Sequence, residues 1–229
     1  MIKKLCFKTL PSTNTYAKEE IANLTLPSLI IANEQTAGRG RRGNSFFSPK
    51  DTGLYMTLVF KENCNPELLT PAAAIAVCNA LEKFGINPKI KWVNDVFLNN
   101  KKVCGILTER FIHSGCAYIA LGIGINISTC NFPEGLDIAG SINTDCDKSE
   151  LADDICKNIL EYVETPDNEN IIRKYRRLLF ILGRKVSYVK NNTEYSGTAI
   201  DINDQCNLII RHADGSEAVL SSGEISIKI

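Results

Sequence analysis

Three glycines and three arginines alternate in a short segment of this 229-residue chain, between residues 33 and 49. Glycine admits backbone conformations that bring N–H groups close to a ligand, and the forked arginine guanidinium matches phosphate or carboxylate oxygens. The segment has neither the Gly-Lys-Ser/Thr ending of one phosphate loop nor the glycine spacing of a dinucleotide fingerprint. We therefore expect it to fold around an anion and to be poorly ordered until the ligand arrives.

Two other interpretations of this segment stay open. One is a solvated basic turn, which is a common surface feature. The other is an Arg-Gly segment bound to nucleic acid, with Phe46 or Phe47 stacked on a base. Lysine plus arginine equal aspartate plus glutamate, 26 against 26. The chain thus lacks the global basic field of most nucleic-acid binders, which disfavours the second interpretation.

Metal and triad chemistry have little support in the composition. Nine cysteines are scattered without a Cys-x-x-Cys pair, and there are only two histidines. This pattern fits neither a disulfide framework nor a zinc site nor a Ser-His-Asp triad, so buried free thiols are expected and no metal ligand is assigned.

The N-terminal apolar run is too short for a signal peptide, and no stretch could span a membrane. We expect a cytoplasmic protein with no membrane partner.

Apolar elements on both sides must position the Gly-Arg segment. A strand in residues 1–10 precedes a helix for which Ser12 or Thr13 is the N-cap, although these polar groups could also face a ligand. The short strand 29–32 leads into the segment, strand 53–60 follows it, and an apolar helix is expected over 66–84.

Downstream, a strand, a polar corner at Asn94 and Asp95, and a hairpin turning at Asn99-Asn100 are predicted. Strand 118–127 places Gly122 and Gly124 on one face. Their missing side chains leave either close backbone packing or a slot for a flat ligand.

The composition changes near Gly183. Two helices, 149–162 and 168–182, precede it, and five short strands follow it over 184–189, 194–202, 208–211, 218–220 and 224–229. We expect two domains, residues 1–182 and a small barrel over 183–229.

Three motifs together resemble the biotin protein ligases, also called biotin–[acetyl-CoA-carboxylase] ligases. They are Gly38-Arg39-Gly40-Arg41-Arg42-Gly43 with Phe47-Ser48-Pro49, Lys91-Trp92-Val93-Asn94-Asp95 with Lys102 and Gly105-Ile106-Leu107, and Gly122-Ile123-Gly124-Ile125-Asn126. Ser12-Thr13-Asn14, Gln35 and Gly223-Glu224-Ile225-Ser226 extend the similarity over nearly the whole chain.

The resemblance implies an α+β fold: a mixed sheet with flanking helices, a class II synthetase-like ligase core, and a C-terminal SH3-like β-barrel. It also implies a reaction in which biotin and MgATP give biotinyl-5′-AMP, and a lysine of a biotin carboxyl carrier protein then takes the biotinyl group. ATP and biotin are thus expected as substrates and Mg²⁺ as cofactor. Both a monomer and a homodimer fit the resemblance.

Site residues are carried over by motif position. Lys102 and Arg39 are expected to be catalytic. Contacts to biotin or biotinyl-AMP are expected from Ser12, Thr13, Asn14, Gln35, Arg39, Gly40, Arg41, Lys102, Gly122 and Gly124. Nucleotide contacts are expected from Trp92, Asn94, Asp95 and Asn126.

The chain departs from the family at three positions: Val93 replaces the usual proline, Phe46 a tryptophan and Asn44 a common arginine. The first catalytic strand is expected within a few residues of Met1. We therefore expect the ligase-only form, without the N-terminal helix-turn-helix of regulatory members and without specific DNA binding. A lipoyl or octanoyl transferase of related fold is the alternative enzyme, and a non-catalytic Arg-Gly and barrel module is the alternative from another class.

Overall fold

The structure is a computed structural model, and it describes residues 2–223 and 225–227. Its larger sheet has seven strands in the order β1-β2-β3-β7-β6-β5-β4. β1 and β2 pair in parallel and the other neighbours are antiparallel, so the sheet is mixed. In this spatial order the strands are β1 (Lys3–Phe7), β2 (Ser28–Ala32), β3 (Gly53–Lys61), β7 (Cys116–Asn126), β6 (Lys101–His113), β5 (Asp95–Leu98) and β4 (Lys89–Lys91).

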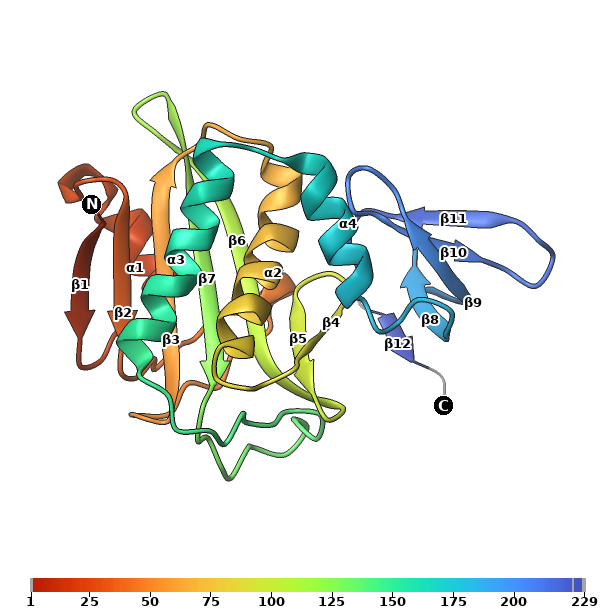
Figure 1. The fold of residues 1–229 in the computed structure, drawn as a ribbon, viewed down its shortest axis with the longest axis horizontal. Coiled ribbons are helices and arrows are strands. Elements are labelled where there is room, and N and C mark those ends of the chain that lie inside the picture. Colours follow the sequence, from red (N-terminus) through yellow and green to blue (C-terminus); the bar gives the residue numbers. More distant parts are fainter. Residues whose placement is uncertain (1, 224, 228–229) are drawn as a thin grey trace.

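Helices cover both faces of this sheet. In Figure 1, α2 (Leu69–Glu82), α3 (Lys148–Glu164) and α4 (Asn168–Leu178) lie over one face, and α1 (Thr13–Glu19) lies behind it. Three short 3₁₀ turns, η1 (Ile21–Asn23), η2 (Arg41–Gly43) and η3 (Pro66–Leu68), complete the helical segments of the described residues. Successive strand residues point to opposite faces, so β3, which is buried from Gly53 to Phe60, contributes to the packing on both sides.

Local signals set several boundaries where the sequence predicts them. Ser12 is the N-cap of α1, and its hydroxyl accepts a hydrogen bond from the Thr15 N–H at 3.4 Å. Asn99 and Asn100 have φ of 49° and 63°, which is the left-handed geometry of a tight hairpin turn between β5 and β6.

The C-terminal sheet has five antiparallel strands in the order β11-β10-β9-β8-β12. They are β8 (Lys185–Lys190), β9 (Thr193–Ile202), β10 (Leu208–Arg211), β11 (Glu217–Leu220) and β12 (Ile225–Ile227). The predicted strand 224–229 is confirmed at Ile225–Ile227, while Glu224, Lys228 and Ile229 lie outside the described residues. With the mixed sheet and its helices, this confirms the expected α+β class.

The predicted end of the helix before Gly183 is wrong. α4 ends at Leu178, because Leu179 adopts an extended conformation and the Phe180 N–H donates to the Ile90 carbonyl of β4 at 3.2 Å. Pairing with a strand that is distant in sequence therefore ends the helix four residues early.

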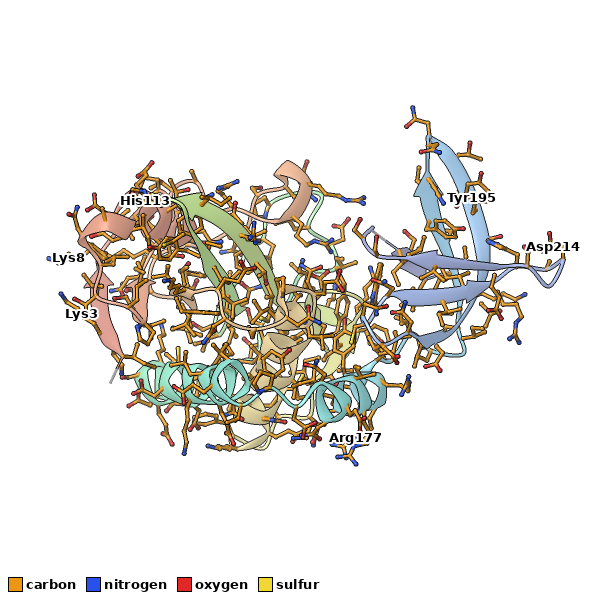
Figure 2. The ribbon with its side chains drawn as sticks, turned by 90° about the horizontal axis from the view of Figure 1, so that it is seen from above. Lys3, Lys8, His113, Arg177, Tyr195 and Asp214 are labelled. Carbon is orange, nitrogen blue, oxygen red and sulfur yellow. The ribbon has the colours of Figure 1, made fainter. Side chains whose placement is uncertain are left out.

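The C-terminal sheet is joined to the larger sheet by a shared core. One hydrophobic cluster contains Ile90 and Trp92 as well as Val186 and Leu208. The indole N–H of Trp92 donates to the Cys206 carbonyl at 2.8 Å. Figure 2 shows Tyr195 and Asp214 on hairpins that project from this sheet, at the opposite end of the molecule from Lys3 and Lys8.

Replacing Trp92 by phenylalanine is expected to lower the free energy of unfolding by about 1–3 kcal/mol, because the buried Cys206 carbonyl loses its donor. Urea denaturation followed by circular dichroism measures the change, since Trp92 is the chain's single tryptophan. Tyr195→Phe, which changes an exposed ring of the same sheet, is the control. Equal stability of the two variants would contradict a structural role for this hydrogen bond.

All nine cysteines are free thiols, of which Cys78, Cys104, Cys156 and Cys206 are buried. In the part of the chain that the structure describes, no helix is both long and apolar enough to cross a membrane.

Candidate functional site

A cavity of about 340 Å³ opens where the N-terminus of α1, the Gly-Arg loop, and strands β5, β6 and β7 meet. Residues from β12 and the turn before it, Gly223, Ile225 and Ser226, close one wall. The cavity gathers almost every site residue predicted from the sequence. These are Ser12, Thr13, Asn14, Gln35, Arg39, Gly40, Arg41, Trp92, Asn94, Asp95, Lys102, Gly122 and Gly124.

Polar groups at the α1 end of the cavity are held in fixed positions. The Gln35 Oε1 atom accepts hydrogen bonds from the Thr13 N–H and hydroxyl at 2.9 and 3.1 Å. The Thr57 hydroxyl donates to Asn14 Oδ1 at 2.6 Å, and the Asn14 amide donates to the Leu107 carbonyl at 3.2 Å. Ser12, Thr13 and Asn14 are each only 3% exposed. This end therefore presents largely buried, preorganised amide and hydroxyl groups.

Two side chains that line the cavity, those of Asn14 and Phe46, pack against the glycines of β7. A Cβ atom at Gly122 would meet the Asn14 carboxamide, with the Cγ atom at 2.9 Å. One at Gly124 would meet the Phe46 ring, with Cζ at 2.7 Å. Side chains, rather than another backbone segment, thus lie against these glycines, and the slot for a flat ligand stays a prediction. The glycines let Asn14 and Phe46 approach the sheet and so shape the cavity.

Opposite charges meet at the β5–β6 end. The Lys102 ammonium lies 2.7 Å from Asp95 Oδ1, with both side chains partly buried. This carboxylate oxygen makes no hydrogen bond of good geometry among the described residues, so the contact is electrostatic. Next to it, the Arg41 guanidinium donates to Asn94 Oδ1 at 3.1 Å, and the Asn94 amide donates to the Ile106 carbonyl at 2.9 Å. Two cations are therefore held over one end of the cavity.

The Gly-Arg loop folds back on itself. The Phe46 N–H donates to the Gly38 carbonyl at 2.9 Å, and the Gly40 N–H to the Asn44 carbonyl at 2.7 Å. Arg42 and Gly43 at its tip have φ of 56° and 81°. That the loop is poorly ordered without ligand stays a prediction.

One charged residue that the motifs do not mark, Glu109 on β6, contacts this site. Its carboxylate accepts from the Asn14 amide and the Lys18 ammonium, both at 2.9 Å, and lies 3.3 Å from the Arg39 guanidinium. Burial alone would raise the pKa of Glu109. The hydrogen bonds from Lys18 and Asn14 and the charges of Lys18 and Arg39 outweigh burial, so the pKa lies below its ordinary value.

Two predicted nucleotide residues are placed differently from the others. Asn126 is absent from the cavity wall, because it is 4% exposed and its amide donates to the Gly140 carbonyl of the covering loop at 3.0 Å. Trp92 lines the cavity, yet its indole N–H faces the C-terminal sheet. The structure adds wall residues that sequence reasoning did not assign to the site, among them Phe46, Lys91, Ile138 and Gly223.

No cluster of three His, Cys, Asp or Glu residues that could hold a metal ion occurs within residues 2–223 and 225–227. Asp95 supplies a single carboxylate at the cationic end. A divalent ion there would need ligands from a substrate such as a phosphate group.

Models of two protein families match the chain. The biotin/lipoate A/B protein ligase family matches residues 6–126, and the biotin protein ligase C terminal domain matches residues 181–228.

Curated relatives agree with these matches. The chain is 28% identical over 232 residues to the bifunctional ligase/repressor BirA of Escherichia coli, covering 96% of this chain and 72% of that protein. It is 37% identical over 125 residues to the biotin–[acetyl-CoA-carboxylase] ligase of Paracoccus denitrificans, covering 51% of each.

Solved structures resemble the whole fold. A biotin protein ligase from Aquifex aeolicus in complex with biotin and ATP superposes with a TM-score of 0.82 at 26% identity, covering 99% of this chain and 98% of that chain. A biotin protein ligase from Leishmania major in complex with biotinyl-5-AMP gives 0.65 at 25% identity, covering 96% and 99%.

Proposed function

We propose a two-step reaction for this chain, which belongs to the biotin/lipoate A/B protein ligase family and is a biotin protein ligase with biotin and ATP as substrates. In the first step the biotin carboxylate attacks the α-phosphate of ATP, forming biotinyl-5′-AMP and releasing pyrophosphate. In the second step a lysine amine attacks the acyl carbon, an amide forms, and AMP leaves with the bond electrons. The acceptor is a lysine of a biotin carboxyl carrier protein.

The observation that carries this proposal is the division of the cavity into a neutral polar end and a cationic end. Ser12, Thr13, Asn14 and Gln35 offer fixed donors and acceptors to the biotin ring. Gly122 and Gly124 allow the Asn14 and Phe46 side chains to lie close against the sheet, where both line the cavity.

The cationic end suits the reacting groups. A carboxylate that attacks a phosphate must overcome repulsion between two anions, and preorganised cations at the developing charge lower that barrier. Lys102 and Arg41 stand at this end, and Arg39 and Gly40 come from the loop above. Both reacting groups belong to the substrates, so the step needs no nucleophile from the protein.

Mg²⁺ is the proposed cofactor of the first step. Asp95 would hold it together with the phosphate oxygens of ATP, and its buried Oδ1, which the Lys102 ammonium neutralises at 2.7 Å in this structure, would then be shared with the ion. The bound ion would neutralise phosphate charge as pyrophosphate leaves. Trp92, Asn94 and Asp95 are proposed to lie beside the nucleotide. Asn126 is proposed to act indirectly, because it lies behind the cavity wall and its amide holds the loop at Gly140.

Biotin-dependent exchange of labelled pyrophosphate into ATP tests the first step. Lipoate and octanoate, offered in place of biotin, are the matched controls, because the family includes lipoate ligases. Exchange supported by lipoate but not by biotin would contradict the proposal.

Replacing Arg39 by alanine is expected to let biotinyl-5′-AMP escape about tenfold faster or more, because the loop would close less tightly over it. A rapid-mixing chase of labelled intermediate measures its dissociation rate. Arg184→Ala changes an arginine outside the cavity and is the control. An unchanged dissociation rate in the Arg39 variant would show that the loop does not act as a lid.

The division into a catalytic domain of residues 1–182 and an SH3-like domain of 183–229 is likewise proposed, supported by the ranges of the two family matches.

We place the protein in the cytoplasm, where biotin, ATP and the carrier meet. Specific DNA binding is not expected from a chain of zero formal net charge. Sedimentation equilibrium distinguishes a monomer from a homodimer.

A further inference from the structure

Glu109 holds an unusual position relative to the site. It lies on β6 outside the cavity wall, yet it contacts Asn14 from the α1 end and Arg39 from the loop. Its side chain is 19% exposed, so the carboxylate is largely removed from water and depends on its partners.

Two cations share one oxygen of this carboxylate. The Lys18 ammonium lies 2.9 Å from Glu109 Oε1, and the Arg39 guanidinium lies 3.3 Å from the same atom. Lys18 is the closer and the less exposed of the two, with 26% of its side chain accessible against 45% for Arg39. Lys18 is on the short helix α1 and Arg39 is on the loop, so only Arg39 belongs to a segment that is expected to move.

We propose that Glu109 is the resting partner of Arg39, and that Lys18 sets how readily Arg39 leaves it for the phosphate of the substrate. This rests on the proposed role of Arg39 in the ligase reaction. When Arg39 leaves, Lys18 still neutralises Glu109, so no carboxylate is left half-buried and unpaired. Without Lys18, Arg39 would be the remaining cation at this oxygen, and its departure would be opposed.

Glu109 also sets the orientation of Asn14. Its Oε2 atom accepts from the Asn14 amide at 2.9 Å, which leaves Oδ1 of Asn14 facing Thr57 and Gly122. Glu109 and Lys18 are thus positioning residues that act through Arg39 and Asn14 rather than on the substrate.

The test measures how often the loop opens in the absence of substrate. Limited digestion of the ligand-free protein with trypsin, read by mass spectrometry for cuts after Arg39, Arg41 and Arg42, reports how often the loop opens. Lys18→Met is expected to slow these cuts about 2- to 5-fold, and Glu109→Gln to speed them by about the same factor. The double variant should behave like Glu109→Gln. Lys4→Met, which removes the partner of Asp153 in an exposed ion pair of 2.6 Å, is the matched control and should change nothing.

Adenylate formation gives a second readout. Lys18→Met should raise the KM for ATP about 2- to 5-fold, and adding Glu109→Gln should reverse that rise. A purely structural role predicts instead that both single variants shift loop cleavage in the same direction and that the double variant is worse than either, and this result would overturn the proposal. Failure of the parent protein in pyrophosphate exchange would refute the ligase reaction but leave the cleavage result to stand by itself.

Discussion

Replacing Lys102 by alanine is expected to slow the formation of biotinyl-5′-AMP by about 10²–10³-fold, with the fold kept intact. The ammonium is held 2.7 Å from Asp95 at the cationic end of the cavity, where the biotin carboxylate and the α-phosphate would meet. Its removal takes away a preorganised positive charge and also leaves Asp95 to repel both anions. Single-turnover formation of biotinyl-5′-AMP measures the effect on the chemical step.

Lys83 provides the control for this variant. It forms an ion pair of the same length, 2.7 Å to Asp154, on the helical side of the molecule. Lys83→Ala should leave the rate unchanged, because an exposed pair contributes little and stands outside the cavity. Near-normal adenylate synthesis by the Lys102 variant would show that its charge does not act on the reacting groups.

Replacing Gly122 by alanine is expected to weaken biotin binding by about tenfold or more and to lower the free energy of unfolding by about 1–3 kcal/mol. The added methyl group would be driven into the Asn14 carboxamide, which is held by Thr57, Leu107 and Glu109 and cannot simply rotate away. Calorimetric titration with biotin and thermal unfolding measure the two effects.

A double variant separates the clash from a general intolerance of β7. Asn14→Ala combined with Gly122→Ala removes the group that the methyl meets, so stability should rise above that of Gly122→Ala alone, while biotin binding stays weak. If the two substitutions merely add in their cost to stability, the contact between Asn14 and Gly122 does not explain the glycine.

The sequence was most informative where structure is decided locally. The Ser12 cap, the Asn99-Asn100 turn and the alternation that puts Gly122 and Gly124 on one face depend on residues close in sequence, and all three are confirmed. The end of α4 was missed because the competing partner of its last turn, Ile90 of β4, is distant in the chain.

The site shows the same division. Almost every residue assigned by motif resemblance lines the cavity, but what faces each glycine depends on how α1 and the loop pack on the sheet. Asn126 has the strand parity of Gly122 and Gly124, yet the loop around Gly140 covers it. Glu109 was missed because a single carboxylate on a strand carries no signal, and Lys18 and Arg39 reach it only through the tertiary fold.

The wall formed by Gly223, Ile225 and Ser226 has a consequence for biosynthesis. On the ribosome, the polar and cationic ends of the cavity emerge early, whereas this wall is translated after all the other residues that line it. A nascent chain can therefore fold much of its larger sheet before it can enclose a reactive acyl-adenylate. Activity should appear only after Gly223, Ile225 and Ser226 have left the ribosome and packed against the cavity, and a chain stopped by a premature stop codon before Gly223 should retain an open cavity from which any intermediate is lost to hydrolysis.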